Sequence, residues 1–244
     1  IYNIFMEPQP FTILGTSHLV TLIIIFSLAI FFPRSYRHKS YEDKEKLAKI
    51  LGVAIICLEL VKPFIWNSMG YPWIRLIPIH MCNLSALFIG YFLLTKKRIF
   101  FEVAFFWGIG GGVNALITPD VSLTFPDPKY IIFFLGHGFL MINIGYACIA
   151  LNNRPTFSSV KNGILFSLSV LPIIYLINIL LGPPANYWYL GAKPIDGQSV
   201  MDFFPDPPLH IPLLIIIGAC LFLLVYSPYW VYDKVKQRDA ESIR

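Results

Sequence analysis

The sequence predicts an all-helical, polytopic membrane protein: a seven-transmembrane-helix bundle in a single domain over residues 1–244, with the N-terminus outside and the C-terminus in the cytoplasm. Three observations lead to this prediction. The chain contains seven apolar stretches of membrane-spanning length. Its residues are 56% hydrophobic and only 14% charged, too few charged residues to form the surface of an ordinary water-soluble protein. Most of its basic residues fall on one side of the predicted membrane.

Each apolar stretch is close to the ~20 residues that a helix needs to cross a ~30 Å hydrocarbon layer at ~1.5 Å per residue. The first stretch lacks a basic leader region and a small-residue cleavage site, so we expect a transmembrane helix there and not a signal peptide. The long connection at 182–211 is rich in Pro, aromatic residues and Asp, and we expect it to fold as a cap on the outer side. The seven stretches are approximately residues 11–32, 49–66, 76–94, 99–117, 130–151, 163–181 and 212–230.

Positive charges set the orientation, because Lys and Arg are retained on the cytoplasmic side during insertion. Fifteen of the nineteen lie on one side: Arg34, Arg37, Lys39, Lys44, Lys46, Lys49, Lys96, Lys97, Arg98, Arg154, Lys161, Lys234, Lys236, Arg238 and Arg244. The other side holds Lys62, Arg75, Lys129 and Lys193. This asymmetry also accounts for the net charge of +5, so we expect no nucleic-acid partner.

The polar residues inside the predicted spans share one depth. Glu59, Cys82, His137 and His18 lie six or seven residues from the outer ends of their stretches, which places them ~9 to 10 Å deep at helical rise. Three further polar residues lie slightly shallower: His80, Asn114 and Asn178. Because an unpaired polar group facing lipid costs several kcal/mol, we expect them to face a wet or ligand-filled cavity in the outer third of the membrane.

Structural roles compete with functional ones for several of these residues. His18 fits an interhelical hydrogen bond. Glu59 and Lys62, spaced i, i+3, could neutralise each other or handle a ligand or proton, and both readings stay open. The small residues Ala104, Gly108 and Gly112 favour close helix packing. We expect no disulfide and no metal site, because Cys57, Cys82, Cys148 and Cys220 all lie inside spans without metal-ligand spacing.

Cys82 and His137 together could act as a nucleophile and its base. An imidazole that takes the thiol proton turns the sulfur into a good nucleophile. The two residues lie at matching depth on the third and fifth stretches, which run in the same direction. Packing of each residue alone is the competing interpretation.

Several motifs together resemble the transmembrane protein 164 (TMEM164) family, with which bacterial YwaF-like and treponemal membrane proteins are grouped. The segment IPIHMCN at 77–83 is similar to the LPLHLCD signature of these proteins. Further matching segments are FWG at 106–108, NALITPD at 114–120, GHG at 136–138, NYWYL at 186–190 (which contains Asn186 and Tyr187) and KP at 193–194. The resemblance extends over essentially the whole chain and implies a multi-pass protein of the bacterial cytoplasmic membrane.

The resemblance implies lipid acyl chemistry without a cofactor. The animal member is described as an acyltransferase that loads polyunsaturated chains onto ether lysophospholipids, with a Cys and a His as catalytic candidates that match Cys82 and His137. The family is also compared with transmembrane lipid-ester hydrolases. Asn83 departs from the pattern, since relatives carry Asp there, which leaves a dyad in place of a triad.

The first hypothesis is therefore a membrane acyltransferase, transacylase or lipid-ester hydrolase that acts on phospholipids through an acyl-Cys82 intermediate. Asn114, Asn83 or His80 could donate hydrogen bonds to the oxyanion. Asp120 and Lys193 lie where a head group would sit, although Asp120 equally fits a turn. An outer-leaflet phospholipid is a more accessible acyl donor than cytosolic acyl-CoA.

The second hypothesis is a non-enzymatic transporter or lipid-sensing protein. Glu59, Lys62, His80 and His137 would then form a polar relay around a bound solute. The sequence shows neither the inverted repeats nor the broken helices common in secondary transporters. A retinal protein is disfavoured, because the last stretch has no Lys for a Schiff base.

Overall fold

The computed structural model describes residues 9–193 and 203–242, and the regular structure in this part is helical apart from one isolated bridge between Pro10 and Leu123. The chain divides into two compact units, Ile1–Asn153 and Arg154–Arg244. The prediction of one transmembrane domain stays a prediction.

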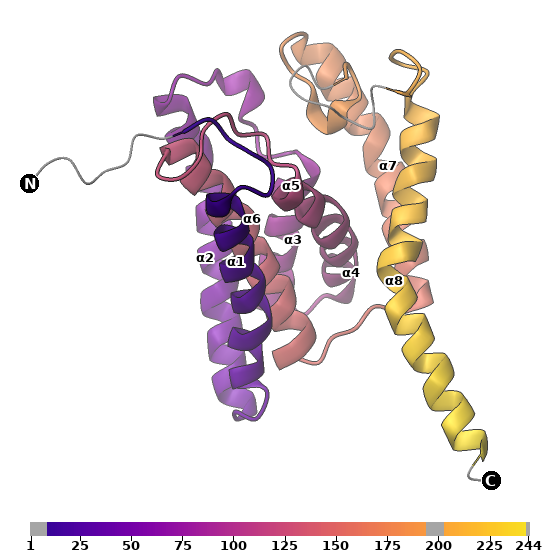
Figure 1. Ribbon diagram of the computed structural model, residues 1–244. Helices are drawn as coiled ribbons and strands as arrows, with labels where there is room; N and C mark the ends of the chain where they lie inside the picture. The colour runs from indigo at the N-terminus through magenta and orange to yellow at the C-terminus, as the bar shows by residue number, and fades with distance from the viewer. Residues whose placement is uncertain (1–8, 194–202, 243–244) are drawn as a thin grey trace, which may run out of the picture. The chain divides into compact units, whose positions relative to one another are not determined.

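The first unit is a helix bundle in which the turns at 37–40 and 96–97 are short and the connections at 69–80 and 118–127 are longer (Figure 1). Two of its helices contain a π-helical segment: α4 continues through η2 into α5, and α6 continues into η3. The elements are α1 (Thr16–Tyr36), α2 (Tyr41–Ser68), η1 (Trp73–Arg75), α3 (Met81–Thr95), α4 (Arg98–Trp107), η2 (Gly108–Gly112), α5 (Val113–Ile117), α6 (Pro128–Gly145) and η3 (Tyr146–Ala150).

The second unit contains two long helices, α7 (Phe157–Leu181) and α8 (Ile211–Ser242), which pack against each other. A 3-10 turn, η4 (Tyr187–Tyr189), lies in the connection between them. The predicted outer cap at 182–211 is folded where it is described, and its residues 194–202 lie outside the described part of the chain.

Local sequence explains where the helices begin and end. Ser40 precedes α2, and its side chain accepts a hydrogen bond from the Asp43 N–H at 3.1 Å, as an N-cap residue does. Asp127 caps α6 in the same way, with Pro128 at the first helical position. Lys96 ends α3 in a left-handed conformation with φ 58°. These signals set the turns between the membrane helices.

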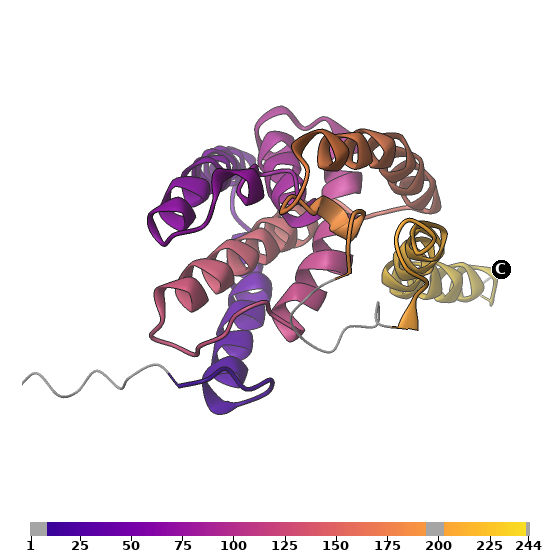
Figure 2. The same cartoon turned by 90° about the horizontal axis from the view of Figure 1, so that it is seen from above.

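Small residues let neighbouring helices approach closely, as membrane bundles require. A Cβ on Gly52 of α2 would lie 2.8 Å from the Gly90 carbonyl oxygen of α3. On α6, a Cβ on Gly145 would collide with the Ala29 carbonyl of α1. In the first unit, seen from above in Figure 2, α2 therefore packs against α3 and α1 against α6.

Five helical segments of the described chain are long and apolar enough to cross a membrane: Thr16–Tyr36, Arg98–Ile117, Pro128–Ala150, Phe157–Leu181 and Ile211–Arg238. α2 contains the predicted span 49–66 but begins at Tyr41. The predicted span 76–94 was placed too early, because α3 begins only at Met81 and residues 76–80 are irregular. The protein is a polytopic, multi-pass integral membrane protein.

Basic turns of the first unit meet at one end of the bundle. Lys96 Nζ, after α3, forms an ion pair with Glu45 Oε1 of α2 at 3.0 Å. Tyr146 Oη of η3 donates a hydrogen bond to the Lys44 carbonyl oxygen at 2.9 Å. Residues 34–49 and 96–98 are therefore on the same side, as the charge pattern requires, and the orientation of that side toward the cytoplasm stays a prediction.

Candidate functional site

Cys82 is the second residue of α3 and lies at the start of that helix. His80 occupies the N-cap position in an extended conformation and makes no side-chain cap hydrogen bond. The first backbone N–H groups of a helix have no intrahelical partner and carry a partial positive charge. Cys82 is half-buried, and all four cysteines are free, as expected.

Gly111 of η2 lies beside the Cys82 sulfur. A Cβ on Gly111 would lie 3.7 Å from Cys82 Sγ, an ordinary contact distance. The neighbouring glycines are different, because a Cβ on Gly112 would lie 2.9 Å from Met141 Cε and one on Gly108 would lie 2.8 Å from Ser85 Oγ. Packing therefore requires Gly108 and Gly112, as the sequence predicts, whereas a methyl group at Gly111 would fit in contact with the thiol. π-helical turns such as η2 are frequent at functional sites.

A buried polar cluster lies next to this thiol. Glu59 and Lys62 of α2 form an ion pair, and Asn83 Nδ2 donates a hydrogen bond to Glu59 Oε2 at 2.8 Å. A Cβ on Gly136 would lie 2.9 Å from Lys62 Nζ, so the ammonium group rests against α6 one residue from His137. Lys62 is also close enough to Cys82 and His137 to act on both electrostatically. The cluster thus connects α2, α3 and α6.

His137 of α6 is held in one orientation. Its Nδ1 lies 2.9 Å from the Phe133 carbonyl oxygen, and its ring is 4.3 Å from the Phe133 ring, centroid to centroid. A carbonyl oxygen can only accept, so Nδ1 carries the hydrogen and the neutral ring keeps its lone pair on Nε2. In the described part of the chain, no hydrogen bond joins this ring to Cys82 Sγ.

His18 shows the opposite arrangement. Its Nδ1 accepts a hydrogen bond from the Leu14 N–H at 3.0 Å, and its Nε2 donates to the Leu116 carbonyl oxygen of α5 at 2.8 Å. Both ring nitrogens are used and the side chain is fully buried. His18 is thus a structural link between α1 and α5, as its interhelical interpretation predicted.

Two other predicted site residues lie outside the buried cluster. Asn114, expected as an oxyanion donor, is exposed on α5, and Asp120 is exposed in the segment after α5. His80 is half-buried at the N-cap of α3, next to the first helical turn. Among the described residues, no group of three or more His, Cys, Asp or Glu side chains could hold a metal ion.

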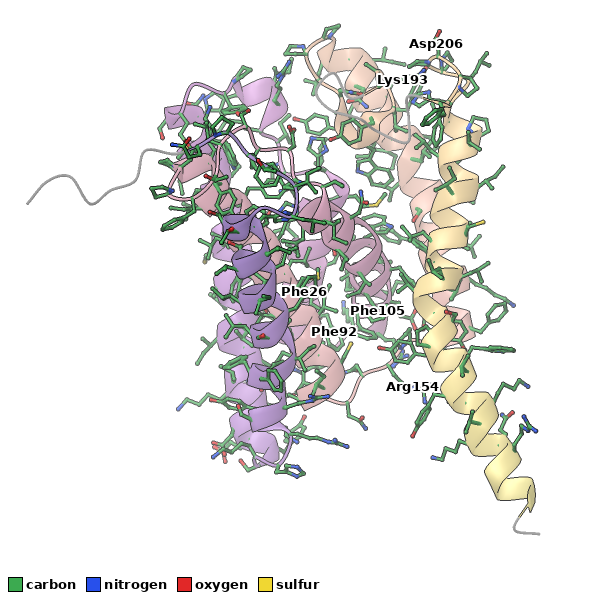
Figure 3. The ribbon with its side chains drawn as sticks, viewed as in Figure 1. Phe26, Phe92, Phe105, Arg154, Lys193 and Asp206 are labelled. Atoms are coloured by element: carbon green, nitrogen blue, oxygen red, sulfur yellow. The ribbon has the colours of Figure 1, made fainter. Side chains whose placement is uncertain are left out.

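The remaining predicted residues belong to the second unit and shape the connection between α7 and α8. Asn178, expected in the cavity, pairs instead with the backbone of Tyr187, accepting from its N–H at 2.7 Å and donating to its carbonyl oxygen at 2.8 Å. The Asn186 side chain accepts from the Gly191 N–H at 3.1 Å. Lys193 Nζ pairs with Asp206 at 3.1 Å (Figure 3) and donates to the Phe204 carbonyl oxygen at 2.7 Å. These contacts are those of a folded cap.

Two features of the site do not follow from the pattern of single residues in the sequence. Gly111 is hidden in the run GIGGG, where only its neighbours match the small-residue spacing. Phe133, one turn before His137, fixes the imidazole through its carbonyl oxygen and its ring. The spacing i, i+4 could have indicated this second contact.

Comparisons with known proteins agree with the motif resemblance. The sequence matches the TMEM164 family over residues 13–226, from before α1 into α8. An uncharacterized protein of Treponema pallidum (strain Nichols) is 27% identical over 213 residues, which cover 86% of this chain and 84% of that protein. No solved structure matches this chain. The chain belongs to the TMEM164 family.

Proposed function

We propose that this protein is a membrane-embedded lipid acyltransferase or transacylase that acts on phospholipids through Cys82 and His137. One observation supports the proposal: the Cys82 thiol lies at the start of α3, beside Gly111, which has no side chain to cover it, and next to a buried polar cluster that reaches α6. The His137 Nε2 lone pair supplies the base that a cysteine nucleophile needs.

In the first half-reaction, His137 Nε2 takes the proton of Cys82 Sγ. The thiolate attacks the carbonyl carbon of a phospholipid ester and forms the C–S bond. The tetrahedral intermediate collapses, the C–O bond to glycerol breaks, and the lysophospholipid oxygen leaves with the proton from His137. The acyl chain remains on Cys82 as a thioester.

In the second half-reaction, the hydroxyl of a lysophospholipid gives its proton to His137 Nε2. Its oxygen attacks the thioester carbonyl, the C–S bond breaks, and the Cys82 sulfur recovers the proton. Water in place of the lysophospholipid would release a fatty acid, so the same two residues also support lipid-ester hydrolysis.

The oxyanion of both steps needs fixed hydrogen-bond donors. Backbone N–H groups in the first turn of α3 suit this role better than the exposed Asn114, because they surround Cys82 and have no intrahelical partners. His80 and Asn83 flank the same turn. The start of the helix would therefore stabilise the negative charge that develops in the tetrahedral intermediate.

A phospholipid ester is the expected acyl donor, since the cluster lies far from the basic end of the bundle. Glu59 follows Leu47 by twelve residues on α2, which is about 18 Å at helical rise. With the basic turns in the cytoplasm, the thiol faces the outer leaflet and is remote from cytosolic acyl-CoA.

Glu59 and Lys62 are proposed to be structural in this mechanism. They pair with each other, and Glu59 also accepts from Asn83, so each charge has an internal partner. In the alternative transporter or lipid-sensing function, the same cluster would exchange protons or bind a solute.

The test uses purified protein in vesicles of diacyl phospholipid with one deuterated acyl chain and an unlabelled lysophospholipid. Mass spectrometry is expected to find the deuterated chain on the lysophospholipid for the wild type, and not for Cys82→Ala or His137→Ala. Cys57→Ala, which removes an exposed cysteine of α2, is the matched control and keeps full activity. No acyl movement with wild-type protein, or equal movement with Cys82→Ala, would contradict the proposal.

A further inference from the structure

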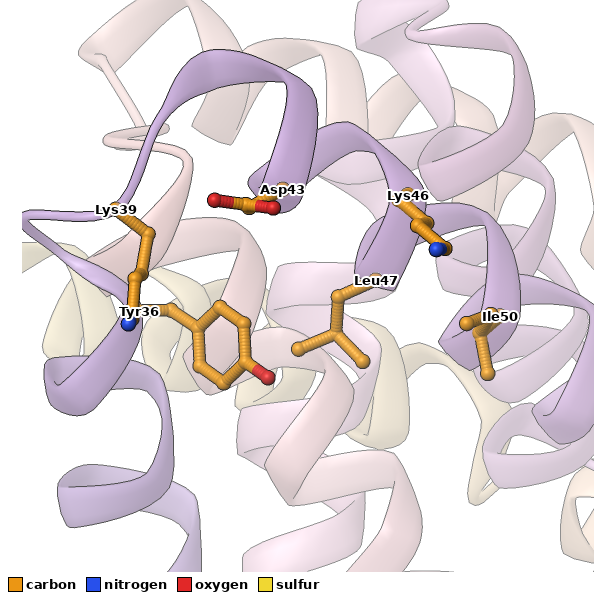
Figure 4. Close-up of a pocket in the computed structure, with 6 residues that line it drawn as sticks. All are labelled: Tyr36, Lys39, Asp43, Lys46, Leu47 and Ile50. Atoms are coloured by element: carbon orange, nitrogen blue, oxygen red, sulfur yellow. The ribbon is translucent and has the colours of Figure 1, made fainter.

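A surface pocket lies where α1 ends and α2 begins, at the basic end of the first unit (Figure 4). Its volume is about 330 Å³, in the range of small-ligand sites. The lining residues are Tyr36, Lys39, Asp43, Lys46, Leu47 and Ile50. This pocket is far from Cys82, so it takes no part in the proposed acyl chemistry.

Two ammonium groups line the pocket without a side-chain partner in the described part of the chain. In the described part of the chain, Lys39 and Lys46 form no ion pair and no side-chain hydrogen bond, and the Tyr36 hydroxyl has no hydrogen-bond partner. Neighbouring groups are engaged: Lys44 Nζ donates to the Arg37 carbonyl oxygen at 2.7 Å. An anion in this pocket would find two cations and one hydroxyl donor.

Asp43 is the one acidic group that lines the pocket, and it has a structural role. Its Oδ2 accepts a hydrogen bond from Ser40 Oγ at 2.8 Å, within the cap of α2. The lining therefore carries two positive charges and one negative charge. Asp43 weakens the attraction for an anion but does not cancel it.

The other wall of the pocket is apolar and continues along the membrane-facing side of α2. Leu47 is half-buried, whereas Ile50 is 55% exposed and Val53, one turn further along, is 51% exposed. A ligand with an anionic head at Lys39 and Lys46 would thus have a path for a hydrocarbon chain along Ile50 and Val53. Long Lys side chains at such a boundary place their charge at the membrane surface.

We propose that this pocket binds the phosphate group of an anionic phospholipid from the leaflet at the basic end of the bundle, predicted to be the cytoplasmic one. Lys39, Lys46 and the Tyr36 hydroxyl hold the phosphate oxygens, and an acyl chain follows Ile50 and Val53. Basic pockets on the cytoplasmic side of membrane helices suit such head groups. The site is independent of the acyl reaction and of the lipid consumed there.

The test measures binding of dioctanoyl phosphatidylglycerol to the full chain in neutral detergent, by native mass spectrometry at several lipid concentrations. Lys39→Gln and Lys46→Gln are each expected to weaken binding about fivefold, and the double variant about twentyfold or more. Lys49→Gln is the matched control, because it removes an equal charge from an exposed position of the same helix outside the pocket, and less than a twofold effect is expected. Asp43→Asn, which keeps an oxygen for Ser40, is expected to tighten binding.

Two further ligands separate the possible sources of the phosphate. Dioctanoyl phosphatidylcholine, with the same chains and no net charge, is expected to bind several times more weakly, and inorganic phosphate at the same concentration is expected not to compete. Equal effects of Lys49→Gln and Lys46→Gln would show diffuse attraction and overturn the proposal. Competition by inorganic phosphate, equal binding of phosphatidylcholine, or no tightening with Asp43→Asn would also overturn it.

Discussion

Removal of one charge from the Glu59–Lys62 pair is the most direct perturbation of the buried cluster. Lys62→Met keeps the length of the side chain but leaves the Glu59 carboxylate with only the Asn83 hydrogen bond. Glu59→Gln keeps an acceptor for Asn83 but leaves the Lys62 ammonium without its partner, against Gly136. Each single variant therefore leaves an uncompensated charge inside the bundle.

The exposures of the two side chains set the expected size of the effect. The Glu59 side chain is 1% exposed and that of Lys62 is 12% exposed, so water screens neither charge well. Breaking such a pair from one side costs about 3 to 5 kcal/mol, whereas replacing both partners with neutral groups of similar volume is often close to neutral. At about 2 to 4 °C per kcal/mol, each single variant should lose about 6 to 20 °C in Tm. The Glu59→Gln, Lys62→Met double variant should recover most of that loss.

Thermal unfolding of the four proteins in the same detergent, followed by circular dichroism, measures this pattern. Acyl turnover of the double variant in phospholipid vesicles gives a second readout, which the structural role predicts to stay near that of the wild type. Single variants as stable as the wild type would refute the buried-pair argument. A double variant that folds normally but has lost turnover would refute the structural role and favour ligand or proton handling.

Three further predictions follow from the site and the topology. Gly111→Ala should keep the wild-type Tm but lower acyl turnover at least about tenfold, because its methyl group lies against the thiol. Gly108→Ala should mainly lower Tm, because its methyl group collides with Ile144 and Ser85. Equal Tm losses for both variants would contradict the distinction. Iodoacetamide should alkylate Cys82 faster than the other three cysteines, and loss of this fast phase in Cys82→Ser checks the assignment. Single cysteines introduced at Lys39 or Ser122 should differ toward a membrane-impermeant reagent on intact cells, with only position 122 labelled, and the reverse pattern would contradict the orientation.

The helices and much of the cluster could be predicted from the sequence because their causes are local. Apolar runs and basic turns indicate the spans, and the i, i+3 spacing indicates the Glu59–Lys62 pair. The ridge containing Gly108 and Gly112 also packs as expected. The start of α3 was harder to predict, since residues 76–79 are apolar but Pro78 and the preceding 3-10 turn keep them out of the helix.

Long-range partners could not be predicted in the same way. His18 bonds to a carbonyl 98 residues away, and Asn178 bonds to the backbone of the cap, so neither lines a cavity. Depth alone cannot distinguish a polar side chain that faces a cavity from one that faces a backbone carbonyl. It also cannot show that Asn114 lies on the exposed side of α5.

The most direct test of the central claim is a search for an acyl group on the Cys82 sulfur. Purified protein is incubated with diacyl phospholipid without an acceptor, stopped in acid and digested, and the peptide that contains Cys82 is weighed by mass spectrometry. The acyl-cysteine mechanism predicts that this peptide gains the mass of one fatty acyl chain, that hydroxylamine removes it, and that His137→Ala greatly reduces it. No acyl adduct on Cys82, or equal adducts on Cys82 and Cys57, would contradict the mechanism.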